Sequence, residues 1–326
     1  MVPPSPPVVT AFGRGPGERA RLARLVEMGA VAAEGLSVTP EYAAAVALAA
    51  ALHDPAFLST ATWAVAWHQR PGEMPEFVAA SSDGSWLPQG VWLPVGVTLA
   101  HHDPAIDPAV RASWEFLPPE RVLASHARLL GSVPHVVVVR SVTPGTAARW
   151  PRSTVVVAVG AEPPPSPNPL ADHTIGRRHR LAVLSPDAWW PVVCALPEDQ
   201  VAGAVRQVAA AVASAQAGAG GADADRLRAA AVGQVGRAPS PDLAAALAEA
   251  VVQARVAVML AAQGEPPATP PPHWNAGLRR AAAELRAWEA LSLAAAPGPA
   301  DRMRLAEVVT AASAAGLVTG DEGAAA

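Results

Sequence analysis

The character of the chain changes near residue 197, and this change constrains the fold more than any single motif does. Beyond it alanine dominates, and five segments show helical spacing: 198–216, 223–233, 241–263, 275–293 and 300–315. Alanine favours helices and lets them pack closely, because it loses no side-chain entropy. Glycine and proline separate these segments. The sequence therefore predicts a helical domain over residues 198–316, followed by a disordered tail over 317–326.

The segment 275–293 indicates which side of its helix is buried. Its large apolar side chains recur at helical spacing on one stripe: Leu278, Leu285, Trp288 and Leu291. Three arginines stay off that stripe: Arg279, Arg280 and Arg286. This pattern predicts a helix that packs through its apolar stripe.

Residues 16–197 mix strand and helix signals, after a flexible leader over 1–15. Residues 62–82 alternate and turn back as a β-hairpin does, and further strands are predicted near 135–140, 154–160 and 180–184. Residues 135–140 and 154–160 hold continuous β-branched runs, which are typical of strands buried on both faces. Helices are predicted over 18–34, 40–52, 104–116 and 118–130. The expected fold is α+β: a small mixed-sheet domain with flanking helices, followed by an Ala-rich helical domain.

The composition excludes several classes of protein. All 24 basic residues are arginine, so P-loop and Schiff-base chemistry, which need lysine, are excluded. The net charge of −4 offers no basic field for nucleic acid, and the lone Cys194 cannot form an intramolecular disulfide. Neither a secretory leader pattern nor an uninterrupted apolar stretch of ~20 residues occurs. We therefore expect a cytoplasmic protein with no nucleic-acid partner and no membrane insertion.

A hexapeptide is repeated in tandem: Trp86-Leu87-Pro88-Gln89-Gly90-Val91 is followed at once by Trp92-Leu93-Pro94-Val95-Gly96-Val97. Each Leu-Pro-x-Gly suits a β-turn with proline second and glycine fourth. Two interpretations stay open. Either the tryptophans fill the core beside the hairpin, or they form a surface of paired aromatic anchors, which often dominate protein interfaces. The residues of this candidate protein-interaction face are Trp86, Leu87, Pro88, Trp92, Leu93 and Pro94.

No complete catalytic, cofactor or metal signature occurs in the sequence. His101-His102-Asp103 looks like a ligand cluster, but neighbouring side chains point to opposite sides of an extended chain. Asp103 also precedes Pro104, which suits a helix cap. Cys194 lies in an apolar segment and is interpreted as a buried, unreactive thiol. We therefore predict no catalytic residue, no cofactor and no metal.

One basic cluster follows the Pro-rich segment 161–169. Its members are Arg177, Arg178 and Arg180, with His173 and His179 beside them. Arginines bind phosphate or carboxylate groups in a bidentate way, so the cluster is a possible anion-binding site. The other interpretation is a solvated loop that leads into a strand.

The order of motifs over Trp63–Leu130 has a counterpart in a known family. A strand, Trp63–Trp67, leads through a polar turn to a second strand and then to the tandem hexapeptide. A helix with Trp114 and the segment Pro119–Leu123 follow. In this order the chain resembles a domain of actinobacterial proteins associated with type VII (ESX) secretion. The resemblance implies a secretion-associated context rather than an activity.

Three hypotheses of function follow. The first is a non-enzymatic adaptor that binds a partner protein, either secretion machinery or a substrate, through the Trp/Pro/Gly face. Tyr42 is the only tyrosine, and Val46 rather than an acid lies four positions on, unlike in exported ESX substrates. The second is a hydrolase or transferase for a phosphorylated or nucleotide-like ligand, with Asp172, His173 or His179 as acid or base. The third is a homo-oligomeric structural subunit assembled through the helical half.

Overall fold

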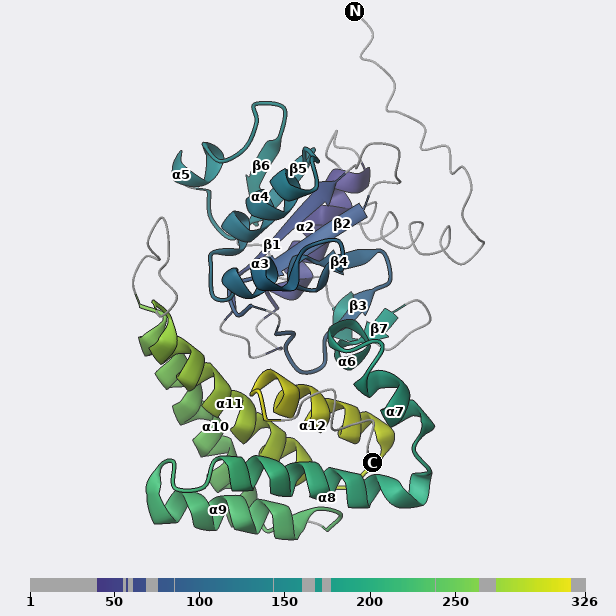
Figure 1. Ribbon diagram of the computed structural model, residues 1–326, viewed down its shortest axis with the longest axis vertical. Coiled ribbons are helices and arrows are strands. Elements are labelled where there is room, and N and C mark those ends of the chain that lie inside the picture. Colours follow the sequence, from purple (N-terminus) through teal and green to yellow (C-terminus); the bar gives the residue numbers. More distant parts are fainter. Residues whose placement is uncertain are drawn as a thin grey trace, which may run out of the picture. The chain divides into compact units, whose positions relative to one another are not determined.

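The computed structural model describes residues 40–54, 57, 61–68, 76–84, 86–142, 144–159, 168–171, 177–237, 239–263 and 274–317 (Figure 1). The leader, the helix expected over 18–34, the hairpin turn, most of the Pro-rich segment and the tail beyond 317 lie outside these residues. The chain divides into two compact units, Met1–His179 and Arg180–Ala326.

A five-stranded mixed sheet forms the centre of the first unit. Its strand order is β4-β2-β1-β5-β6. The strands are β1 (Trp63–His68), β2 (Glu76–Ser81), β4 (Val97–Leu99), β5 (Val136–Val139) and β6 (Val155–Ala158). β1 runs antiparallel to β2 and β5, whereas β4 and β6 run parallel to β2 and β5. The hairpin expected over 62–82 corresponds to β1 and β2, the middle of the sheet.

Helices lie on both faces of this sheet. α2 (Pro40–Leu52) lies behind the strands and α4 (Pro119–Leu129) lies in front of them (Figure 1). Shorter elements complete the unit: 3-10 helix η2 (Ala100–His102), α3 (Pro108–Ser113), α5 (Pro144–Ala147) and 3-10 helix η3 (Pro169–Ala171). The fold class predicted from the sequence, α+β, is confirmed.

α2 is buried on nearly every side. Its buried residues are Ala43, Ala44, Ala45, Ala47, Leu48, Ala49, Ala51 and Leu52. The small alanine side chains allow the helix to lie close against β1 and β5, since they hold the backbones apart by little more than a methyl group.

A second, two-stranded sheet pairs distant parts of the first unit. β3 (Trp92–Pro94) runs antiparallel to β7 (Arg177–His179), with Trp92 opposite His179. We refer to this pair as the β3–β7 ribbon. It brings the second hexapeptide next to part of the basic cluster.

The second unit is helical. Its elements are α6 (Arg180–Leu184), α7 (Trp189–Ala195), α8 (Glu198–Ala215), α9 (Gly221–Gln234), α10 (Pro241–Ala261), α11 (Ala276–Ala294) and α12 (Arg302–Ala314). α11 contacts α8, α9, α10 and α12, and its predicted apolar stripe is buried. Arg286 lies off that stripe but is only 4 % exposed, and its guanidinium pairs with the Glu289 carboxylate at 2.9 Å.

Three local expectations differ from the structure. Residues 180–184, expected to be a strand, form α6, and the neighbouring strand β7 ends at His179. β6 is not buried on both faces: it is the outer strand of the sheet, and Val155 is 52 % exposed. Cys194 is exposed, because the short helix α7 buries Val193 and turns the next side chain away.

α10 is the one described helix that meets the length and composition of a membrane span. Glu249 and Arg255 lie within it, and charged side chains are costly at the centre of a bilayer. These two charges favour the expectation of no membrane insertion, which stays a prediction.

Candidate functional site

The two hexapeptides adopt different structures despite their similar sequences. In the first, the Val91 amide donates to the Pro88 carbonyl at 3.3 Å, and Gly90 adopts a φ of 80°. The turn therefore lies one residue later than predicted, with glycine third, where a left-handed φ is required. The second pairs with β7 as strand β3 and turns at Val95 and Gly96, the positions that correspond to Gln89 and Gly90 in the first.

Most of the candidate interaction face lies in the interior. Leu87 and Leu93 have no exposed surface, Trp86 is 5 % exposed, and Pro88 and Pro94 are also buried. Trp92 alone among the six is half-buried. The core interpretation thus describes five residues of this face, while Trp92 is partly exposed.

The β3–β7 ribbon holds Trp92 in place. Its ring lies edge-on to the imidazole of His179, with the ring centroids 5.1 Å apart, and His179 is 1 % exposed. Beside it, Arg178 donates from Nη2 to the Val97 carbonyl at 2.8 Å, which ties β7 to the start of β4. Trp92 is therefore an aromatic side chain on a rigid support.

The arginines of the basic cluster already have protein partners. Arg178 bonds to Val97, and Arg180 is completely buried, where its guanidinium pairs with the Glu307 carboxylate and donates to the Glu307 carbonyl. Burial lowers the pKa of Arg180, and the charge of Glu307 opposes that shift. His173 lies outside the described residues, and Arg177 is half-buried. A phosphate would have to displace these contacts to be gripped by the cluster.

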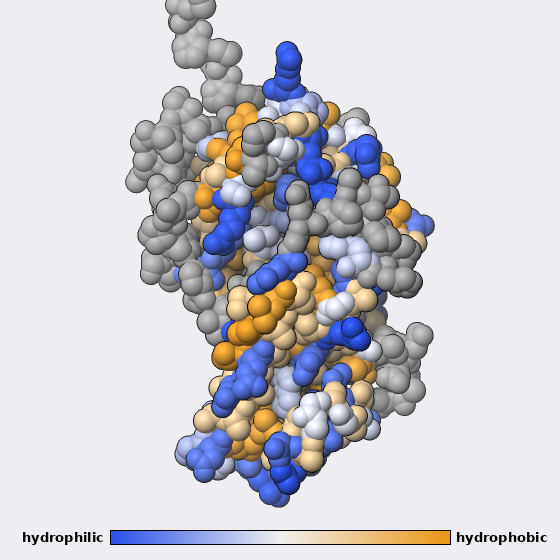
Figure 2. Space-filling model, turned by 90° about the vertical axis from the view of Figure 1, so that its left-hand side faces the viewer, coloured by the Kyte–Doolittle hydropathy of each residue, from blue (hydrophilic) through white to orange (hydrophobic). Residues whose placement is uncertain are grey.

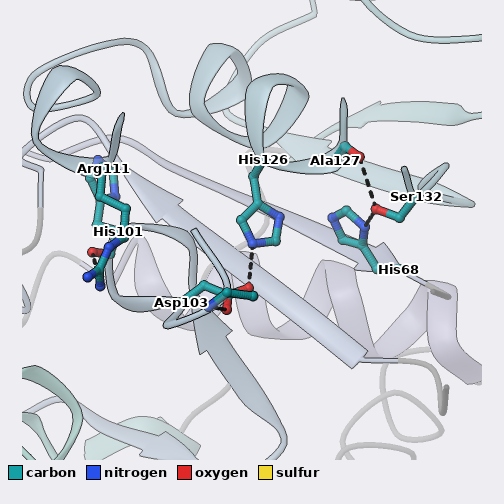
Figure 3. A network of polar contacts seen from close by, with 8 residues as sticks. His68, His101, Asp103, Arg111, His126, Ala127 and Ser132 are labelled. Atoms are coloured by element: carbon teal, nitrogen blue, oxygen red, sulfur yellow. Dashed lines mark hydrogen bonds and ion pairs between the residues drawn. The ribbon is translucent and has the colours of Figure 1, made fainter. Parts of the chain in front are cut away.

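A different set of polar residues gathers inside the first unit (Figure 3). His126, on the apolar face of α4, donates from Nε2 to the Asp103 carboxylate at 2.8 Å, and both side chains are buried. The other carboxylate oxygen of Asp103 accepts the Ala105 amide at 2.9 Å. Asp103 thus caps a turn, as its place before Pro104 suggested, and also joins η2 to α4. We call His68, His101, Asp103, His126 and Ser132 the buried histidine cluster.

His68 and Ser132 form the other half of the cluster. The imidazole Nδ1 lies 2.8 Å from the Ser132 hydroxyl oxygen, and that hydroxyl points to the Ala127 carbonyl at 3.4 Å. The rings of His68 and His126 meet edge to face, with centroids 5.5 Å apart. These contacts join the end of β1 to α4 and to the loop that follows it.

His101 is held as a neutral imidazole. Burial lowers its pKa to about 4, and the nearby His102 and His126 add to the shift. Its ring lies edge-on to Trp114, whose carbonyl is 3.5 Å from Nε2. His53, outside the cluster, is similar: burial lowers its pKa, Nδ1 donates to the Ala49 carbonyl, and Nε2 accepts the Trp63 amide.

The burial of the cluster decides what it can do. Its five side chains are at most 7 % exposed, so a substrate cannot reach the Ser132 hydroxyl or the imidazoles. Among the described residues, no group of three or more His, Cys, Asp or Glu side chains could hold a metal ion. The cluster therefore fastens β1, η2 and α4 together, and is better suited to specifying the fold than to catalysis.

The sequence analysis missed His68, His126 and Ser132. The sequence held a signal for His68 and for His126. His68 continues the alternate positions Ala64 and Ala66 of β1, and His126 follows Val122 and Leu123 on one face of α4, so each was placed on an apolar surface. That they meet there could not be read from positions so far apart along the chain.

Comparison with known proteins gives this fold a family. Residues 54–221 match the family described as EspK C-terminal domain, which spans the sheet, the β3–β7 ribbon and α8. The chain belongs to the EspK C-terminal domain family. EspK is an ESX-1 secretion-associated protein, so the family confirms the resemblance and associates this chain with type VII secretion. No curated protein matches the chain.

Proposed function

We propose that this EspK-family chain is a cytoplasmic, non-enzymatic adaptor that binds a partner protein of a type VII secretion system through the β3–β7 ribbon. Family membership supports the secretion setting. The polar clusters support a binding role over a catalytic one, because the histidine cluster is closed to solvent and the arginines are engaged by protein groups.

Trp92 is the observation that carries the choice of surface. Tryptophan is enriched among the few residues that dominate interface energies, and a rigid support lowers the entropy lost on binding. The other five residues of the candidate face are buried and belong to the core. Replacing Trp86 would therefore disturb the core, whereas replacing Trp92 tests the surface.

The test is affinity capture with the tagged full chain from a lysate that contains a type VII secretion system, read by mass spectrometry. We expect Trp92→Ala to weaken capture of a secretion component by about 30-fold, the loss typical of a central tryptophan. Trp190→Ala is the matched control, because Trp190 is also half-buried but lies on α7 in the other unit. Circular dichroism of both variants checks that they remain folded.

A folded Trp92→Ala variant that captures the same secretion component as strongly as the native chain would contradict the choice of surface. The hydrolase or transferase hypothesis makes a separate prediction: inorganic phosphate or a nucleotide should raise the melting temperature of the native chain but not of Arg178→Ala.

A further inference from the structure

α10 carries large apolar side chains on the side that remains exposed in the described part of the chain. Its buried residues, Leu247, Ala254 and Val258, lie on one side and pack toward α11. Its exposed large side chains are Val252 (54 %), Val256 (42 %), Met259 (48 %) and Leu260 (61 %). Exposed apolar side chains beside charged ones are visible in Figure 2. A helix that is apolar on every side is normally packed against other protein segments, or against lipid, on every side.

The outward residues follow the spacing of a helix–helix seam. Ala245, Val252, Val256 and Met259 are separated by seven, four and three positions, which places them in one row along the helix. This row lies opposite the buried residues Leu247, Ala254 and Val258, since positions about half a turn apart point in opposite directions. We call this row the α10 seam.

The two ends of the seam differ in size and in charge. Toward the start of α10 the outward side chains are small, Ala244, Ala245 and Ala248, and the exposed charges are Asp242 and Glu249. Toward its end the outward side chains are large. Arg255 lies there, and Arg279 and Arg280 are exposed where α11 begins, next along the chain.

This asymmetry selects an orientation for a second α10. Two antiparallel copies place the large side chains of one against the alanines of the other, and the acidic end of one beside the basic end of the other. Parallel copies place alanines against alanines and Glu249 against Glu249 at the same end, which leaves gaps there and adds repulsion between like charges. The antiparallel pair has a two-fold axis, the commonest symmetry of protein oligomers.

Arg255 is available to take part. It lies 3.8 Å from the Glu289 carboxylate, whose closer partner is Arg286 at 2.9 Å. Glu289 therefore keeps a cation if Arg255 turns toward the acidic end of another α10.

We propose that the α10 seam docks against the α10 seam of a second copy of this chain, in an antiparallel, two-fold symmetric dimer. The proposal stands on the second unit alone and does not depend on the β3–β7 ribbon. α10 is about 31 Å long, so this contact is smaller than the ~800 Å² per partner of a standard interface. We therefore expect a dimer that forms with rising concentration rather than a permanent one.

The first test measures the mass of the full chain by sedimentation velocity from about 1 to 100 µM, the range in which a small interface dissociates. We expect a shift from monomer to dimer. The double variant Val256→Glu/Met259→Glu, which adds charge to the seam at exposed sites, should raise the dissociation constant by at least about tenfold. Leu129→Glu/Val155→Glu is the control: it adds the same charge at exposed sites of the first unit and should dimerise normally.

The second test reads the orientation. Cys194 is first replaced by serine, because it is exposed and would form disulfides of its own. Ala245→Cys and Met259→Cys proteins are then oxidised separately and as an equal mixture. An antiparallel seam gives a disulfide between the two different proteins in the mixture, whereas a parallel seam links each protein to itself.

Several outcomes overturn the proposal. One is a monomer at every concentration, and another is a dimer that the Val256→Glu/Met259→Glu variant leaves intact. A monomer that instead binds lipid vesicles, with binding lost in that variant, assigns the seam to a membrane surface. Disulfides between copies of the Met259→Cys protein, with none between the two different proteins in the mixture, exclude the antiparallel arrangement.

Discussion

α2 and α10 are both apolar and rich in alanine, yet α2 is buried on nearly every side while α10 is largely exposed. α2 lies against the sheet and its buried residues extend around the helix, whereas α10 buries one row and exposes four large apolar side chains. Composition alone therefore does not decide burial. What decides it is whether other parts of the chain supply enough surface to cover a helix on every side.

The difference also gives a physical reason for the composition of each helix. In α2, alanine allows close approach to strands on a crowded face, so size is the constraint. In α10, the outward valine, methionine and leucine side chains stay 42–61 % exposed, so their apolar character calls for an external partner.

The largest expected difference in stability is between two variants that each place one charge, the first in α2 and the second in α10. Ala44→Asp puts a carboxylate at a site with no exposed surface and should cost more than about 4 kcal/mol, because the charge finds no partner. Ala257→Asp, at an exposed site of α10, should change stability by less than about 0.5 kcal/mol. Chemical denaturation followed by circular dichroism measures both. Equal losses would mean that α10 is as enclosed as α2.

A second effect concerns the polar cluster on the other face of the same sheet. His126→Ala leaves the Asp103 carboxylate buried without its imidazole partner and should cost about 3 kcal/mol. His102→Ala, at the half-buried neighbour of the cluster, is the control and should cost much less. The double variant Asp103→Ala/His126→Ala should cost less than the two single losses added together. Additive losses would show that the two side chains do not act as a pair.

Acid should destabilise the first unit more than the second. His101 has a pKa of about 4 when folded and the ordinary 6.5 when unfolded, so between these values the unfolded chain binds a proton that the folded chain does not. Stability is therefore lost as the pH falls from 6.5 toward 4, by about 2 kcal/mol at pH 5. The lowered pKa of His53 acts in the same direction.

The second unit carries only His273 in its sequence and should respond less to this change. Hydrogen exchange of the native chain at pH 7 and pH 5, corrected for intrinsic rates, reports on each unit separately. His101→Gln should flatten the response of the first unit. An equal loss of protection in both units would assign the acid response to other groups.

The smallest expected change in stability comes from shortening an exposed side chain of α10. Leu260→Ala, at a side chain that is 61 % exposed, should change the stability of the monomer by no more than about 0.5 kcal/mol. Leu48→Ala in α2, where the same side chain is fully buried, should cost about 3 kcal/mol. Thermal melts at low concentration measure the pair. A large loss for Leu260→Ala in the monomer would show that this side chain is covered from within.

The sequence allowed α2, α4, the helices from α8 to α12 and the central hairpin to be predicted, because their signals are local. Alternation in β1 and helical spacing in α11 can be read from neighbouring positions. Errors arose where the outcome depends on distant partners. β6 has the same valine-rich pattern as β5, and only the strand order reveals that it lies at the edge. The two hexapeptides look alike, and only the pairing of β7 distinguishes them.

The site was predicted less well for the same reason. The sequence analysis selected Trp86 and Trp92 together, but their burial depends on what packs around each one. Asp103 was correctly interpreted as a turn cap, while its second partner, His126, lies on a helix that only the tertiary fold brings near. Periodicity indicates which face is apolar, but not which polar residues meet inside it.

The β3–β7 ribbon also has a consequence for how the chain is made. Arg178 and Val97, which tie β7 to β4, are 81 residues apart in the chain. Contacts between such distant segments form late and slowly, whereas helices joined by short connections assemble quickly. During synthesis, β3 must wait for nearly the whole first unit to leave the ribosome before β7 can pair with it. Trp92 therefore reaches its supported position only when the first unit is complete, so a partner that recognises it would select chains whose first unit has folded.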